Sequence, residues 1–360
     1  MPTAKVVILV LTDNCLRVFE WSGELPTQFA YPHYYQPTDV SRWAAADLQR
    51  RLEDGTRWAE HLRLGIGVPK GPVGKMFGVL VVKTSAGQLG YLSAFSGKMA
   101  GQYVQAEFVP PVYNLQNKAG FFLAGEERLA DLGTQLKALE NAPEWQQAQE
   151  HLTATQQRAD AALQQLKARQ RAAKNVRHAK RAALQQQDPT TAASVLKDLE
   201  EESKRDHFEW KDQKRQWQEK LRQAQARVTA LRQAIDQLKA ARKTHSNQLQ
   251  KRIFQSYSFL NIKGERQDLL DIFAPTFFQT PPAGAGECAA PKLLQYAFQQ
   301  GYQPIAMAEF WWGPPPAAAI RQHGQFYPAC RGKCEPILQH MLAGMDVAPN
   351  PLLRTATSAD

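Results

Sequence analysis

The sequence predicts an α+β protein, in which a mixed α/β base domain carries a long inserted antiparallel coiled-coil hairpin. One observation is that residues 144–252 contain no glycine and only one internal proline, so a segment of this length is ordered only as helix. Another is that apolar residues recur in this segment at alternating spacings of three and four. Short strand-like and helix-like patterns flank it on both sides. We therefore expect the base in residues 16–126 and 255–346, the hairpin in 127–254, and a flexible tail in 347–360.

The helical segment divides into two arms at Asp188-Pro189, because proline lacks the backbone donor and clashes with the preceding turn. A heptad stripe on the second arm specifies a partner helix along its length. Its members are Trp217, Leu221, Ala224, Val228, Leu231, Ile235, Leu238, Arg242, His245 and Leu249. The first arm keeps the same period with mostly smaller residues, at Trp145, Ala148, Leu152, Thr155, Ala159, Ala162, Leu166, Ala173, Val176 and Ala183. Small residues let two helices approach closely, so we expect the arms to pair with each other.

The positive charge of the chain is concentrated on this segment. Residues 151–252 hold 23 Lys and Arg against 11 Asp and Glu, an excess of 12, whereas the whole chain carries +10. The densest cluster lies between residues 158 and 181, a span in which Asp160 is the only acid. Its members are Arg158, Lys167, Arg169, Arg171, Lys174, Arg177, Lys180 and Arg181. Such a cluster is typical of a surface that binds nucleic-acid phosphates. The alternative is an ordinary solvated helix face.

The flanking segments supply the base. Residues 75–83 and 89–95 are apolar, β-branched runs around a Thr-Ser-Ala-Gly turn, which predicts a β-hairpin. Residues 37–62 have helical periodicity, with Ala44, Leu48, Leu52 and Trp58 on one face. A short helix is expected over residues 125–139. After the helical segment, a helix over 291–299 and a short element over 305–312 are expected.

Composition narrows the class of protein. No apolar run reaches the 18 or more residues of a membrane span, so we expect no membrane partner. The opening run Val6–Leu11 is too short for a signal peptide. Four cysteines do not suggest a secreted disulfide scaffold, so the expected compartment is the cytoplasm.

A cysteine motif near the end is the clearest candidate for a metal centre. Cys288, Cys330 and Cys334, together with His323, could supply three thiolates and one imidazole to a structural zinc ion. The alternative is that these cysteines are buried, reduced side chains that act as small hydrophobic residues.

The same motif loosely follows the plan of zinc nucleobase deaminases. In those enzymes a His or Cys is followed two residues later by a catalytic Glu, and a P-C-x-x-C pair follows further on. Here position 290 is Ala and the pair Cys330 and Cys334 is one residue too widely spaced. Deamination is therefore not expected unless Glu287 or Glu309 replaces the missing carboxylate.

Six blocks of sequence resemble the long amino-terminal region of large bacterial RluA-type RNA pseudouridine synthases. These blocks, in order, are Gly74–Val82, Gly90–Gly97, Phe108–Val112, Gly286–Leu294, Ala308–Gly313 and His323–Pro336. The resemblance implies a role in RNA modification, with structured RNA, rRNA or tRNA, as the partner. In that family a separate catalytic domain carries an essential Arg-Leu-Asp motif, which does not occur in this chain. The resemblance thus implies a truncated or split member without catalytic residues of its own.

The expected function is a non-catalytic, RNA-binding accessory region that lies next to a pseudouridine synthase catalytic domain. Two alternatives remain open at this point. One is a zinc-binding, deaminase-like domain, and the other is a structural coiled-coil scaffold.

Overall fold

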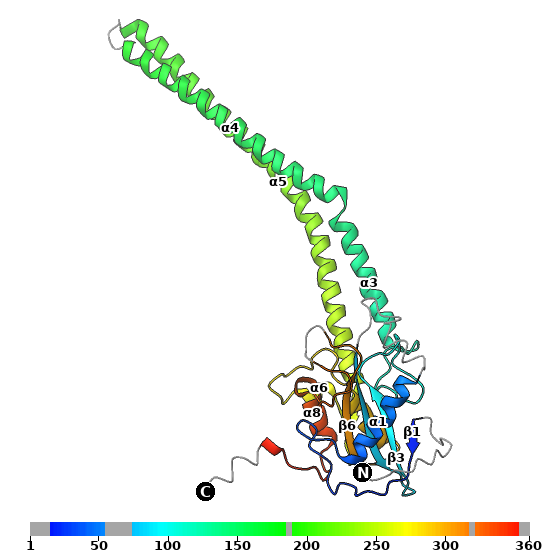
Figure 1. Ribbon diagram of the computed structural model, residues 1–360. Helices are drawn as coiled ribbons and strands as arrows, with labels where there is room; N and C mark the ends of the chain where they lie inside the picture. Colours follow the sequence, from blue (N-terminus) through cyan, green and yellow to red (C-terminus); the bar gives the residue numbers. More distant parts are fainter. Residues whose placement is uncertain (1–14, 55–73, 185–188, 317–320, 353–360) are drawn as a thin grey trace, which may run out of the picture. The chain divides into compact units, whose positions relative to one another are not determined.

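The computed structural model describes residues 15–54, 74–184, 189–316 and 321–352 (Figure 1). The chain forms two compact units. One comprises Met1–Gly125 and Gln248–Asp360, and the other comprises Glu126–Asn247. We call the first the base unit and the second the helical unit. The expected mixture of helix and sheet is confirmed.

The base unit is built on a four-stranded antiparallel sheet. Its order is β1 (Leu16–Val18), β3 (Leu89–Phe95), β2 (Lys75–Lys83) and β6 (Gln303–Trp312). β2 and β3 form the hairpin that the sequence predicts, with Phe77 opposite Phe95 and Lys83 opposite Leu89. β6, more than 200 residues later in the chain, pairs antiparallel with β2 on its other side. The sheet thus joins the two halves of the base.

Alternation along the strands gives the sheet two buried faces. Phe77, Val79 and Val81 pack with α1 (Asp39–Glu53), and Leu80 and Val82 pack on the opposite side. The expected helical face of α1 is confirmed for Ala44, Leu48 and Leu52, which are fully buried. Trp58 lies outside the described residues.

The second face is covered by three helices, α6 (Leu269–Phe273), α7 (Ala289–Gln299) and α8 (Arg331–Met341). A small sheet of β4 (Ser258–Leu260) and β5 (Arg266–Asp268) completes this layer. α7 lies so close to β2 that a side chain at Gly78 would bring its Cβ within 3.0 Å of both Ala289 and Leu293. The glycine therefore sets how closely the start of α7 approaches the sheet.

A buried charge cluster joins α1 to the sheet. Asp47, 6% exposed, accepts a hydrogen bond from the Tyr91 hydroxyl and forms ion pairs with Arg17 and Arg50, both at 3.0 Å. Arg51 lies 3.7 Å from the same carboxylate and also pairs with Glu107. Because several cations surround one buried acid, this carboxylate organises the α1 side of the base.

Three long helices account for the helical segment. These are α3 (Phe121–Glu140), α4 (Pro143–Leu184) and α5 (Pro189–Ser256). The expected break at Pro189 is confirmed, because α5 starts there. Figure 1 shows α4 and α5 side by side, and the ion pair Arg177–Asp206, at 2.7 Å, joins them. Several predicted seam residues are buried, among them Ala148, Thr155, Ala159 and Leu166 on α4 and Ala224, Val228, Ile235 and Leu249 on α5. No helix among the described residues is long and apolar enough to cross a membrane.

Candidate functional site

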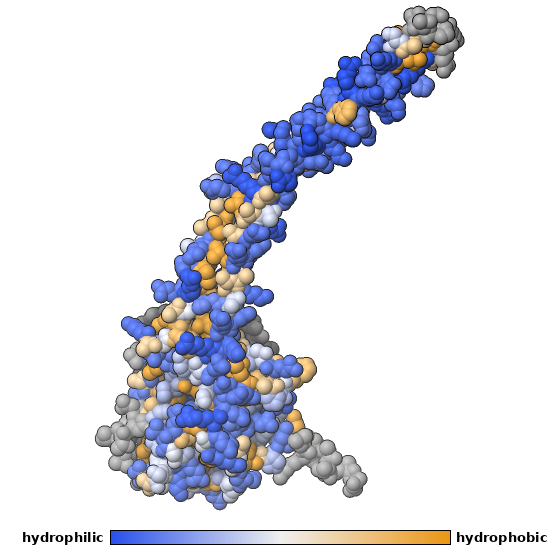
Figure 2. Space-filling view, turned by 180° about the vertical axis from the view of Figure 1, so that it is seen from behind, coloured by the Kyte–Doolittle hydropathy of each residue, from blue (hydrophilic) through white to orange (hydrophobic). Residues whose placement is uncertain are grey.

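The helical unit presents most of the predicted cationic cluster to solvent. Six of its eight members are exposed and have no carboxylate of the described residues within ion-pair distance, namely Arg158, Lys167, Arg171, Lys174, Lys180 and Arg181. Figure 2 shows that hydrophilic side chains cover most of the visible surface of α4 and α5 away from the base unit. These six residues are therefore available to a charged partner.

The other two predicted members have partners within the protein. Arg169 forms an ion pair with Glu209, and Arg177 pairs with Asp206 and is 7% exposed. Both acids lie on α5, so these two arginines connect the helices. The charge pattern of α4 alone could not separate them from the exposed group, because the acids that neutralise them are 29 to 40 residues away in the sequence.

The exposed cations form a straight row. Lys167, Arg171, Lys174 and Arg181 follow the spacing four, three and seven, and the exposed His178 lies between the last two. Residues at such spacings share one face of a helix. The row extends over 14 residues, about 21 Å at 1.5 Å per residue. We refer to Lys167, Arg171, Lys174 and Arg181 as the cationic row.

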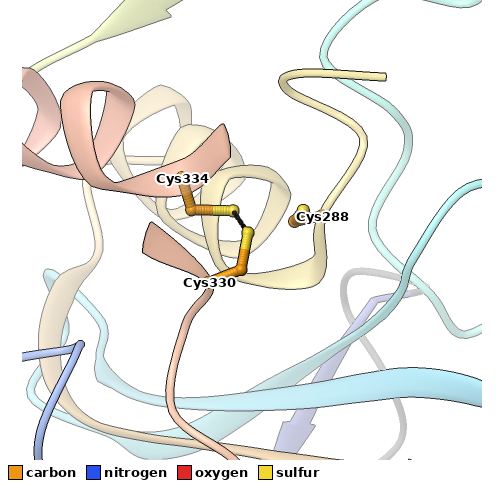
Figure 3. Close-up of side chains that lie close together, drawn as sticks. All are labelled: Cys288, Cys330 and Cys334. Carbon is orange, nitrogen blue, oxygen red and sulfur yellow. Dashed lines mark hydrogen bonds between the residues drawn. The ribbon is translucent and has the colours of Figure 1, made fainter. Parts of the chain in front are cut away.

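The base unit brings three of the four predicted metal ligands together. The sulfur atoms of Cys288, Cys330 and Cys334 all lie within 4.8 Å of one another, and those of Cys330 and Cys334 are 3.3 Å apart (Figure 3). Cys288 is the N-cap residue of α7, and Cys330 is the N-cap residue of α8. The two helices thus begin at the same place and direct the three thiols toward one another. We refer to these residues as the cysteine cluster.

The three thiols of the cluster differ in acidity. Hydrogen bonding with Cys288 and Cys334 lowers the pKa of Cys330, and the amides of Lys333 and Cys334 in the first turn of α8 act in the same direction. Hydrogen bonding within the cluster, together with burial, raises the pKa of Cys288 and of Cys334.

His323 does not join the cysteine cluster. Its Nδ1 accepts a hydrogen bond from the backbone amide of Gly313 at 3.0 Å, and its ring lies 4.0 Å from the ring of Trp312. The structure thus places His323 apart from the three cysteines with which the sequence grouped it. Proximity in sequence suggested His323, but the chain between β6 and α8 carries it to the end of β6 instead.

A buried carboxylate lies beside the cluster. Glu309 is directly opposite Gly78 in the β2–β6 register, and its Oε1 accepts a hydrogen bond from the amide of Ala290 at 3.2 Å. Burial raises the pKa of Glu309 to about 8, and the neighbouring Cys330 adds to this effect. Position 290 lacks a carboxylate in the sequence, but the structure brings one to it from β6. A lone acid within the apolar run 305–312 was the available signal.

A cavity of about 530 Å³ adjoins the same place. Its wall includes Glu287 and Cys288 before α7 and Lys333 in the first turn of α8. Tyr257, which donates a hydrogen bond to Glu287, and Lys75, whose pKa burial lowers, also line it. These residues come from distant segments, so sequence reasoning could not group them.

Comparisons with known proteins identify no relative. The chain matches no protein family, no curated protein and no solved structure.

Proposed function

We propose that this chain is a non-catalytic, RNA-binding accessory region of the RluA-type pseudouridine synthase context, and that it contacts structured RNA through the cationic row. The observation that carries the proposal is that Lys167, Arg171, Lys174 and Arg181 are exposed on one helix face without a neutralising acid among the described residues. The six sequence blocks quoted above support the RNA-modification context.

The distribution of acids supports a polyanionic partner. Four acids on α5 each form an ion pair with an arginine, namely Glu209 with Arg169, Asp206 with Arg177, Asp212 with Arg215 and Glu219 with Arg222. The cationic row receives none of them. Like charges at these spacings repel each other and slightly destabilise a helix. No acid of the described residues offsets this repulsion in the cationic row, so bound phosphate groups would offset it.

For the finer architecture, we propose that α4 and α5 form an antiparallel coiled-coil hairpin within one molecule. The support is the ion pair between Arg177 and Asp206 and the burial of the predicted seam residues. A structural scaffold that dimerises through these helices is the competing function. Sedimentation equilibrium of the full chain distinguishes the two, because the hairpin arrangement predicts a monomer over the micromolar range.

The RNA-binding proposal is tested by removing the charge of the cationic row. The variant Lys167→Gln, Arg171→Gln, Lys174→Gln, Arg181→Gln should bind a transcribed tRNA or an rRNA hairpin more weakly than the parent. If all four side chains contact phosphates, the slope of log affinity against log salt should decrease in magnitude by about 2.8 to 3.6, since each phosphate contact contributes about 0.7 to 0.9.

The matched control changes four cations that already have partners. Arg128, Lys204, Arg215 and Arg222 each form an ion pair on the helical unit, so their change to Gln removes the same formal charge. We expect this variant to retain most of the parent's salt slope. If the two variants changed the slope equally, the cationic row would act only through the net charge of the protein and not through direct phosphate contacts. An unchanged slope in the first variant would refute the proposed contact.

A further inference from the structure

The cysteine cluster has the dimensions of a single-ion site. In a tetrahedral zinc site with Zn–S bonds of about 2.3 Å, the sulfur atoms lie about 3.8 Å apart. The three sulfur atoms here lie within 4.8 Å of one another, and those of Cys330 and Cys334 are 3.3 Å apart. One ion placed between them would require sulfur shifts of no more than about 1 Å on this geometry. Thiolate ligands select zinc among the common divalent ions.

A disulfide does not account for the cluster. The 3.3 Å between the sulfur atoms of Cys330 and Cys334 exceeds the bonded distance of about 2.05 Å, and any pair would leave the third thiol at the same spot. The three cysteines also pack in the apolar core of the base, and the feature that favours a metal over ordinary packing is that all three meet at the start of two helices. Two helices begin at the cluster, with Cys288 and Cys330 at their N-cap positions, and Figure 3 shows the sulfur atoms of Cys330 and Cys334 facing each other.

The described residues provide three protein ligands and no fourth. His323 is held at the end of β6 by Gly313 and Trp312. Cys288 connects the cysteine cluster with the 530 Å³ cavity, because it belongs to the cluster and also lines the cavity. Zinc sites with three protein ligands keep a position for water or a small ligand, whereas closed four-ligand sites do not.

We propose that Cys288, Cys330 and Cys334 bind one zinc ion whose fourth position is open to this cavity and holds an exchangeable water. The cavity walls define what could replace that water. Tyr103 and Tyr257 offer aromatic surfaces, and Lys75 and Glu287 offer charges of opposite sign. These groups suit a small planar molecule with nitrogen or oxygen donors. The proposal is independent of RNA binding by the helical unit.

The first measurement is metal content. The parent, purified without added metal, should contain one zinc per chain, and Cys288→Ser and Cys334→Ser should bind zinc at least about 10- to 100-fold more weakly. Cys15→Ser is the matched control, because Cys15 is a half-buried cysteine of the base unit outside the cluster. It should retain full zinc content. Iron in place of zinc, or no metal in a parent that also fails to take up zinc after reduction, would overturn the proposal.

The second measurement tests the open position and does not depend on the folding of any variant. The parent is stripped with a chelator and reloaded with Co²⁺, whose ligand-field bands report the number and type of ligands. Imidazole, small enough for the cavity, should shift these bands in a saturable manner by replacing the water. His323→Ala should give the same spectrum and the same imidazole response as the parent. Bands that ignore imidazole, or that change in His323→Ala, would show a closed site and would refute the open position.

Discussion

Replacing Gly78 by alanine tests whether the close approach of α7 to the sheet fixes this layer of the base. A Cβ at this position would lie 3.0 Å from Ala289 Cβ, 3.0 Å from Leu293 Cδ1 and 3.4 Å from Glu309 Cγ. Ordinary carbon contacts lie at about 3.5 to 4.0 Å, so α7 must move by several tenths of an ångström. Ala289 and Leu293 are fully buried, which leaves them little room. Overpacking of this kind costs about 1 to 3 kcal/mol of the free energy of unfolding.

Gly332→Ala is the matched control, because it is the same chemical change in the same layer with the opposite expectation. A Cβ at Gly332, the second residue of α8, would meet no atom within 4 Å outside its chain neighbours and the nearby backbone of its own helix. Alanine at this position, where the helical backbone suits it, reduces the entropy of the unfolded chain and should stabilise the base by about 0.4 to 1 kcal/mol. The assay is hydrogen exchange of the β2 and β3 amides, whose protection reports global opening of this unit. If the amides of Gly78→Ala were as protected as those of the parent, or if both substitutions changed stability in the same direction, the packing argument would be refuted.

Two further predictions concern buried charges. Asp47→Asn should lower the free energy of unfolding of the base by about 3 to 5 kcal/mol, because it leaves Arg17 and Arg51 around a neutral group. The control Asp131→Asn breaks an exposed pair with Arg128 and should cost less than about 1 kcal/mol. Urea unfolding measures both variants. Lys292 donates to the carbonyls of Phe95 and Gly97, and burial lowers its pKa to about 8 from 10.5. The native state thus releases this proton at a lower pH than the unfolded state, and the contribution of Lys292 to stability should rise with pH between about 8 and 10.5, by at most about 3 kcal/mol. Lys292→Met should lack this rise, and parallel pH profiles of parent and variant in denaturant titrations would contradict it.

Local patterns were sufficient to predict most elements of the fold. The hairpin of β2 and β3, the apolar face of α1 and the break before α5 each follow from residues that are neighbours in sequence. The pairing of β2 with β6 could not be predicted in this way, because the helical segment separates the two strands. Alternating residues such as Val79 and Leu80 predict two buried faces but not which strand lies beside them.

The candidate sites were predictable only where their residues are neighbours in sequence. Helix periodicity places Lys167, Arg171 and Lys174 in one row, but only the structure shows that Arg169 faces Glu209. The three cysteines meet because α7 and α8 begin at one place. Nothing in the spacing of His323 could reveal that a backbone amide and an indole hold it elsewhere. Glu309 lies next to Ala290 only through the β2–β6 register.

The cysteine cluster and the cationic row should differ in how well they tolerate substitutions. Cys288 is fixed from two directions, because Gly78 lies beneath the start of α7 and Gly286 precedes it with φ of +85°. A Cβ at Gly286 would lie 2.8 Å from Tyr257 and 2.9 Å from Phe259, so both backbone conformation and space require glycine there. A metal site needs this precision, since its ligand atoms must meet within fractions of an ångström. The cationic row needs only helix spacing and charge, because long, solvated side chains adapt to phosphates. Exchanging Lys and Arg should therefore be tolerated in the row, whereas even the smallest side chain should not be tolerated at Gly286.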